Sequence, residues 1–251
     1  MDFFFDGFST AQIAALVTAA LLIGINKTGI PGIGLLPVLL LTLTFQTRIS
    51  TGLQLVMLCM ADVLAVIWYR RNANWKLVLK LIPAAAVGLA AGTLVVNHLD
   101  DRTMALTIGI IVLFLCILSI VKDYVLKSTY AIPSHWSIAG SAGFLAGFTT
   151  LIANAAGPVM AIYFLSLKLE KKEYIGTGAW YFLIMNWTKL PIFYLQGRIT
   201  AQSFRADLAM IPFVVIGGIA GIVLLKYISQ VWFNRIVIIF SVFAALKLIF
   251  F

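Results

Sequence analysis

The chain has 251 residues, of which 62% are hydrophobic and 11% are charged, and its mean hydropathy is +1.05. Average soluble domains carry about a quarter charged residues, and so few charges cannot cover a water-facing surface. The composition therefore predicts an integral membrane protein and excludes soluble enzymes, disordered proteins and nucleic-acid binders. The net charge of +9 fits this conclusion, because the basic residues lie in short tracts between apolar runs.

Apolar stretches follow one another along the chain, and each is interpreted as a membrane-embedded helix. They cover residues 10–25, 32–46, 50–69, 77–97, 103–121, 136–153, 156–167, 174–195, 204–225 and 232–251. The second and seventh are short for a full crossing, which takes about 20 residues. The first two are separated only by residues 26–31, and the sixth and seventh only by a few residues around Asn154. The predicted fold class is an all-α polytopic membrane protein.

Each closely spaced pair is either one broken helix that crosses once, or a hairpin or two full spans that return the chain to its starting side. Basic residues decide between these alternatives, because cytoplasmic loops are enriched in Lys and Arg. Hairpins gather on one side Arg70, Arg71, Lys76, Lys122, Lys127, Lys168, Lys171, Lys172, Lys226 and Arg235, against Arg48, Arg102, Arg198 and Arg205 opposite. Broken helices divide the same residues evenly. The sequence therefore favours hairpins or two full spans, with the larger set in the cytoplasm and both termini outside the cytoplasmic membrane.

Glycine and proline motifs recur in the two halves of the chain. Gly24 and Gly34 match Gly147 and Gly157 at a shift of 123 residues, and the pattern Pro-x4-Gly-x3-Gly occurs at 83–92 and again at 212–221. The chain is interpreted as a duplication, with a first transmembrane repeat over 1–125, a cytoplasmic linker over 126–135 and a second repeat over 136–251. Because each half has an odd number of stretches, the repeats are expected to be inverted, an architecture typical of transporters. The glycines spaced four apart are interpreted as close-packing positions.

The two breaks are the predicted anion-binding sites. Gly and Pro free backbone amides at membrane depth, which is tolerated where the backbone lines a cavity, and a helix N-terminus attracts anions. Lys27 adds a positive charge beside the first break. The predicted substrate-binding residues are Asn26, Lys27, Thr28, Gly32, Gly34, Asn154, Ala155, Gly157 and Pro158. The alternative is that Lys27 reaches the membrane interface and that the breaks are ordinary turns.

Ionisable groups inside apolar stretches form a second set of candidates, because they are expensive to place in lipid. Asp62 lies in the third stretch and Lys189 in the eighth, and Asp62 maps within one residue of Asn186 under the repeat shift. The predicted coupling or cavity-lining residues are Gln54, Asp62, Thr177, Asn186 and Lys189. Two interpretations stay open. Either Asp62 carries a proton and Lys189 or Lys27 is a substrate counter-ion, or Asp62 and Lys189 form a purely structural pair.

Enzymatic chemistry is not indicated by the sequence. No nucleophile arrangement, metal-ligand cluster or Walker-type loop occurs in it, and its polar loops are too short to form an ATPase domain. We therefore expect no catalytic residues, no cofactor and no metal site. Any transport is then passive or secondary.

The order of the motifs and one specific stretch resemble a known family. Each half opens with a Gly/Pro-rich break, followed by a span and then by the Pro-x4-Gly-x3-Gly helix. Residues 176–191, GTGAWYFLIMNWTKLP, are similar to the pattern T-x-A-x-x-F-x-x-x-N-x-x-K-x-P. These features resemble the sulfite exporter TauE/SafE family over nearly the whole chain. The resemblance implies a multi-pass permease of the bacterial cytoplasmic membrane that moves small sulfur-containing anions, such as sulfite or organosulfonates, generally outward.

The leading hypothesis is a secondary transporter in which the repeats rock around an anion held at the two breaks, with proton coupling through Asp62. Its partners are then a small anionic substrate, the lipid bilayer and protons, without nucleic acid. The sequence leaves the oligomeric state open, a homo-oligomer included. The alternatives are an anion channel, which never accumulates its substrate against a gradient, and a membrane scaffold without transport activity, which tolerates replacement of both breaks by leucine-rich helix.

Overall fold

The computed structural model describes residues 2–95 and 135–250 continuously, together with isolated positions between 102 and 117. The predicted stretch 103–121 and all but the last residue of the predicted linker, 126–135, lie outside the two continuous ranges, as do Lys122 and Lys127. The regular elements of the described residues are all helical. The predicted all-α class is therefore confirmed for this part of the chain.

The helices follow the predicted apolar stretches. In the first half they are α1 (Asp2–Phe5), α2 (Thr10–Thr28), α3 (Leu35–Thr44), α4 (Thr47–Tyr69), a 3-10 turn η1 (Arg70–Asn72) and α5 (Trp75–Val95). In the second half they are α7 (Trp136–Ala153), α8 (Ala156–Ser166), α9 (Lys171–Leu195), α10 (Ala201–Ala209), α11 (Ile211–Tyr227) and α12 (Gln230–Phe250).

One stretch needs correction, because residues 204–225 do not form a single helix. They are divided between α10 and α11, which meet at Met210 with a bend of 47°. Pro212 lies in the first turn of α11. Proline has no amide hydrogen, so it suits the first turn of a new helix and interrupts a continuous one.

After α2 the chain turns back toward the end of the bundle where it began. The α2 helix starts with a capping box in which the Ser9 hydroxyl accepts a bond from the Gln12 amide. It ends shortly before Gly32, whose φ of 108° requires glycine. Helix α3 then runs back along α2, and the Phe45 ring that follows it packs against the Phe8 ring that precedes α2, with centroids 5.8 Å apart. The first break is therefore a hairpin.

A second hairpin joins α7 and α8. The α7 helix is terminated by Asn154 at a left-handed φ of 51°, which asparagine tolerates better than most residues. Trp136, which begins α7, lies beside Lys80 of α5, and Phe164 of α8 packs on Tyr174 of α9 with centroids 5.2 Å apart. Both α5 and α9 begin at this end of the bundle, where η1 contacts α9. The chain thus enters α7 and leaves α8 at the same end.

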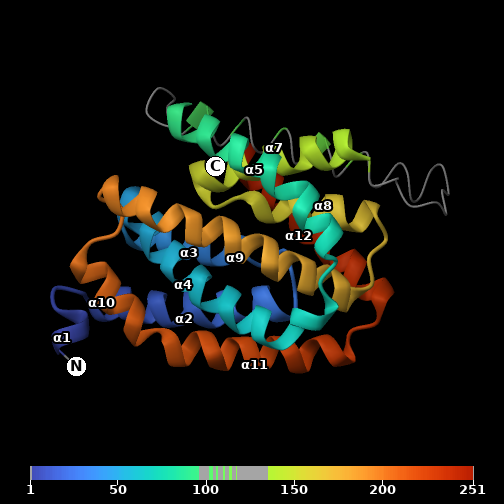
Figure 1. Cartoon of the computed structure of the whole chain (residues 1–251). Coiled ribbons are helices and arrows are strands. Elements are labelled where there is room, and N and C mark those ends of the chain that lie inside the picture. Colours follow the sequence, from blue (N-terminus) through green and yellow to red (C-terminus); the bar gives the residue numbers. More distant parts are fainter. Residues whose placement is uncertain are drawn as a thin grey trace.

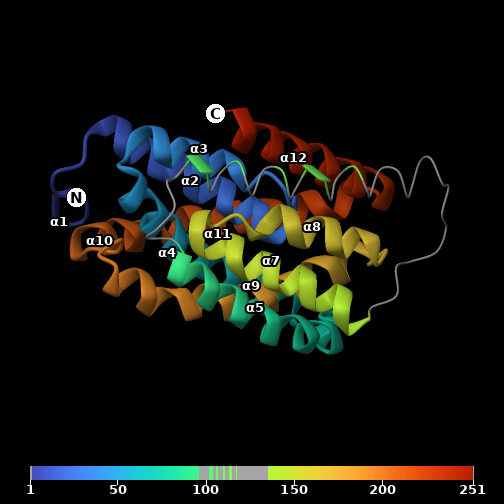
Figure 2. The same ribbon diagram turned by 90° about the horizontal axis from the view of Figure 1, so that it is seen from above.

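Two close helix pairs enclose the centre of the molecule. The α5 helix packs on α7 and the α2 helix packs on α11, while α4 and α9 lie between these pairs (Figure 1). From above, α8 lies between α12 on one side and α7 on the other (Figure 2). Glycines make the outer contacts close, since a Cβ at Gly147 would meet the carbonyl oxygen of Ala85 and one at Gly24 would meet that of Val214. Small residues allow membrane helices to approach in this way.

Helix length and composition fit a multi-pass membrane protein. Within the described ranges, Thr10–Thr28, Ile49–Asn72, Trp75–Val95 and Gln230–Lys247 are long and apolar enough to cross a membrane, and the bent pair α10 and α11 adds a fifth candidate if it counts as one span. The α7 and α8 helices are apolar but shorter. The described members of the larger basic set lie where α4, α8 and α11 end and α5, α9 and α12 begin.

Candidate functional site

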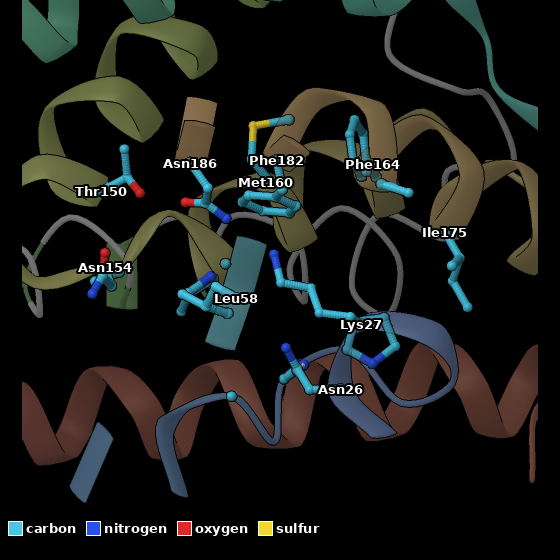
Figure 3. A pocket seen from close by; sticks show the side chains of 18 of the residues that line it. Asn26, Lys27, Leu58, Thr150, Asn154, Met160, Phe164, Ile175, Phe182 and Asn186 are labelled. Carbon is cyan, nitrogen blue, oxygen red and sulfur yellow. Dashed lines mark hydrogen bonds between the residues drawn. The ribbon is translucent and has the colours of Figure 1, made fainter. Parts of the chain in front are cut away.

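A cavity of about 100 Å³ lies where the two hairpin turns meet α4 and α9 (Figure 3). Most of the predicted site residues line it, namely Asn26, Lys27, Gly32, Gly34, Gln54, Asn154, Ala155, Gly157, Pro158 and Asn186. Thr150 and the apolar side chains of Leu58, Met160, Phe164 and Phe182 complete much of the wall. The two breaks, which are far apart in the sequence, therefore contribute to one cavity.

Lys27 stands at the cavity wall and forms a buried ion pair. Its Nζ lies 2.7 Å from Oδ1 of Asp62, and the two side chains are 8% and 0% exposed. The same ammonium lies 4.1 Å from the centre of the Phe182 ring, a cation–π contact. Asn186 Nδ2 donates to the other carboxylate oxygen of Asp62 at 2.6 Å. The carboxylate is thus held by one cation and one amide, and Figure 3 shows the Lys27 ammonium and the Asn186 amide directed toward one another.

Lys189 has a different set of partners from the one that the sequence suggested. The structural pair of Asp62 with Lys189 is not formed, because Asp62 on α4 faces the last turn of α2 and pairs with Lys27. The fully buried Lys189 ammonium instead donates to Thr150 Oγ1 at 2.8 Å, to the Thr150 carbonyl at 3.2 Å and to Asn154 Oδ1 at 2.7 Å. It therefore stabilises the end of α7 at the second break.

The Asn154 side chain links three elements around the cavity. Its Oδ1 accepts from Lys189 of α9, while its Nδ2 donates to Gln54 Oε1 at 3.0 Å and to the Thr51 carbonyl at 3.2 Å, both on α4. All of these bonds agree with one orientation of the amide, with oxygen toward the cation and nitrogen toward the carbonyl groups. The second break is therefore fixed relative to both α4 and α9.

The helices that start at the two breaks bring backbone amides to the cavity. Gly34 and Ala155 precede α3 and α8, and neither makes a side-chain capping bond. In the first break the Asn26 Oδ1 accepts from the Gly32 amide at 3.1 Å. Uncapped helix N-termini carry partial positive charge and free donors. Two such termini reach the cavity wall through Gly34 and Gly157.

Four predicted residues, Asp62, Lys189, Thr28 and Thr177, do not line the cavity, and the two threonines hold helices together. The buried Thr28 hydroxyl donates to the Gly218 carbonyl of α11 at 2.7 Å and to the Gly24 carbonyl at 3.0 Å. Thr177 Oγ1 accepts from the Asn74 amide at 2.9 Å. The structure thus gives both threonines contacts between helices.

The charges around the cavity favour an anion. Among the described groups, the ammonium groups of Lys27 and Lys189 are accompanied by the single carboxylate of Asp62, and all acceptors of Lys189 are neutral. No carboxylate is thus paired with the Lys189 ammonium among these groups, and charges interact strongly in surroundings of low dielectric. The helix N-termini add to this field.

A comparison with known protein families matches residues 12–248 to the family described as sulfite exporter TauE/SafE. The chain belongs to the sulfite exporter TauE/SafE family. This confirms the predicted family, and TauE/SafE membership makes the chain a membrane transporter rather than an enzyme. Comparisons with curated proteins and with solved structures gave no significant match.

Of the residues of this TauE/SafE protein that were not among the predicted site residues, three had a signal in the sequence. Thr150 lies 123 residues after Lys27, so the repeat shift contained a signal for it. Phe182 is the aromatic residue of the family-like pattern in 176–191. Asp207, which is fully buried on α10, lies four residues inside the ninth apolar stretch, where a carboxyl group is as unusual as Asp62 is in the third.

Proposed function

We propose that this chain is a secondary transporter that exports small sulfur-containing anions of the sulfite or organosulfonate class across the cytoplasmic membrane. The observation that carries the proposal is the cavity at which the Lys27 ammonium and two helix N-termini meet. A tetrahedral or pyramidal oxyanion presents several acceptor oxygens, which match the amides and the ammonium group. Asn26, Lys27, Gly34, Asn154 and Gly157 are the proposed binding residues.

We further propose that residues 1–125 and 136–251 are inverted repeats. Two close helix–helix contacts made through glycines support this view, because they join corresponding positions of the two halves. Gly24 of α2 contacts α11 near Gly217, and Gly147 of α7 contacts α5 near Gly88. Gly24 corresponds to Gly147 at a shift of 123, and Gly88 to Gly217 at a shift of 129. The α2–α11 contact is thus the counterpart of the α7–α5 contact.

Alternating access follows from such an arrangement. Inverted repeats can exchange conformations so that a central site opens first to one side and then to the other. The anion would bind between the breaks, and the buried Lys27–Asp62 pair would adjust as the cavity opens. In this proposal the basic ends of α4, α8 and α11 face the cytoplasm and both termini lie outside.

The proposal is tested by flux in proteoliposomes containing the full-length protein. Labelled sulfite and methanesulfonate are offered, and wild type is compared with Lys27→Ala and Asn154→Leu, each checked for folding by gel filtration. Both variants are expected to reduce flux at least tenfold. Lys226→Ala is the matched control, because this lysine is exposed at the end of α11 and its loss should leave flux unchanged. Unchanged flux in both cavity variants refutes the proposed site.

The same experiment separates the other functions. Accumulation of sulfite against its gradient under an imposed pH or electrical gradient identifies a coupled transporter. Flux that only follows the sulfite gradient identifies a channel. A protein that moves no anion and tolerates leucine-rich replacement of both breaks is a scaffold, and the proposed function is then wrong.

A further inference from the structure

The α10 helix carries a buried carboxyl group that the cavity does not use. Asp207 is 0% exposed, and neither of its side-chain oxygens has a hydrogen-bond partner among the described residues. Its neighbours Ala206 and Met210 belong to an apolar cluster that includes Leu53 and Met57 of α4. An ionised carboxylate without donors is very costly in such surroundings, and a carboxyl group there takes up a proton instead.

Asp62 gives an internal comparison for this carboxyl group. It is equally buried, but the Lys27 ammonium and the Asn186 amide both donate to it. These donors stabilise the ionised form of Asp62, whereas Asp207 has none in the described part of the chain. Two carboxyl groups in such different surroundings are suited to different tasks, one as a fixed counter-charge and the other as a carrier of a proton.

The charged and titratable groups near Asp207 are few. The Cys59 thiol of α4 interacts electrostatically with it. Arg205, on α10 itself, is half-buried, and Asp6, after α1, is exposed. Lys226 lies at the far end of α11, the third helix that contacts α10. Cys59 also interacts electrostatically with Asp62 and with both buried lysines, so Asp207 and the groups beside the cavity share this neighbour.

A hollow in the surface lies one helical turn before Asp207 along α10. This hollow of about 570 Å³ is lined by Val56 of α4 and by Thr200 and Phe204 at the start of α10. Cys59 follows Val56 by one helical turn, and Asp207 follows Phe204 by one turn, so these two groups stand one turn deeper than the hollow. The order along α4 and α10 is therefore hollow, then Cys59 and Asp207, then Asp62 at the cavity.

The bend at Met210 connects this carboxyl group to the anion site. Asp207 lies three residues before the bend of 47° between α10 and α11. The α11 helix packs closely on α2 through Gly24 and Gly217, and α2 carries Lys27 in its last turn. A movement of α11 would therefore act on Asp207 at one end and on the anion site at the other.

We infer that Asp207 is a proton-binding site of this transporter. The carboxyl group keeps its O–H proton while it is buried, and the proton passes to water when α10 moves relative to α4. This inference rests on the proposed transport function and names the group that makes it depend on protons. It assigns Asp62 the role of counter-charge to Lys27.

The test compares coupled proton movement in proteoliposomes that contain a pH-sensitive dye. Wild type, Asp207→Asn, Asp62→Asn and Asp6→Asn are given a sulfite gradient, and protons moved per sulfite are measured. Asp6 is the matched control, because it is an exposed aspartate at the same end of the bundle. We expect Asp6→Asn to behave as wild type and Asp207→Asn to lose at least nine tenths of the proton movement per sulfite. An unchanged ratio in Asp207→Asn overturns the inference, as does a loss confined to Asp62→Asn.

A second measurement uses the unmodified protein and needs no transport. A hydrophobic carbodiimide reacts with protonated carboxyl groups in apolar surroundings, and mass spectrometry locates the adduct. We expect Asp207 to be labelled faster at acidic than at alkaline pH and Asp6 to remain unlabelled. No labelling of Asp207 at any pH overturns the inference, even if Asp207→Asn is inactive. If wild type moves no anion, the transport function fails separately, and labelling still decides whether Asp207 holds a proton.

Discussion

The ion pair between Lys27 and Asp62 allows a quantitative test by a double-mutant cycle. The two groups are 2.7 Å apart and almost completely buried, and removing one partner of such a pair costs about 3–5 kcal/mol because the other charge remains unpaired. Lys27→Met leaves the Asp62 carboxylate with Asn186 alone. We therefore expect a loss near the upper part of this range.

Asp62→Asn should cost less, because the remaining ammonium keeps its contact with Phe182, worth about 2 kcal/mol when desolvated, and lines a cavity that can hold an anion. The double variant contains no buried charge at this position. It should be more stable than Lys27→Met, so the coupling energy between the two sites should be about 2 kcal/mol or more, within the range for residues in direct contact.

The assay is unfolding of the purified protein in mixed micelles of dodecyl maltoside and increasing sodium dodecyl sulfate, followed by tryptophan fluorescence. Lys226→Met, at an exposed position, controls for the loss of a positive charge. Added sulfite should stabilise Asp62→Asn more than wild type, because the lone Lys27 then gains an anionic partner. Strictly additive single and double variants would refute the reasoning, since they would show that the pair contributes no net interaction.

Three further outcomes follow from other contacts. Gly147→Ala should lower the free energy of unfolding by about 1–3 kcal/mol through overpacking, because its Cβ would meet the Ala85 carbonyl. Gly140→Ala should raise it by up to about 1 kcal/mol through helix propensity, because a Cβ at Gly140 meets nothing within 4 Å. Equal shifts in the melting temperatures of the two variants would contradict this expectation. Lys189→Met should lower both the melting temperature and sulfite flux, because three buried oxygen atoms lose their donor. Each buried acceptor left without a partner costs about 1–3 kcal/mol of stability. Normal flux would show that the second break holds its shape without this lysine. Thr28→Val should cost about 1 kcal/mol and leave sulfite affinity in a binding titration unchanged, whereas weaker binding would place this hydroxyl in the site.

The sequence predicted the positions of the breaks and the depth of several polar groups in the membrane, but it did not predict which side chains these groups contact. The repeat shift related Asp62 to Asn186, and these side chains are bonded in the structure. Hydropathy did not show that Asp62 faces Lys27 rather than Lys189. Each residue rotates a helix face by about 100°, so the choice of partner depends on helix rotation and on which helices are neighbours, and both are set by tertiary packing.

Asp207 and Thr28 illustrate the same limit. Asp207 lies only four residues inside an apolar stretch, and the packing of α10 against α1, α4 and α11 surrounds it. Thr28 belongs to the break in sequence, yet the close approach of α11 directs its hydroxyl to the Gly218 carbonyl. In both cases a neighbouring helix from elsewhere in the chain decides the surroundings of the side chain.

The glycine contacts also determine which parts of the molecule can move as bodies. The α2 helix comes from the first half of the chain and is bound to α11 of the second, while α5 of the first half is bound to α7 of the second. Each tight pair therefore mixes the two halves, and a rigid unit of the moving protein need not coincide with either half of the sequence. A half produced alone would leave its glycine-lined faces without partners, whereas two halves produced from separate genes in one cell would together supply every such contact and should reassemble.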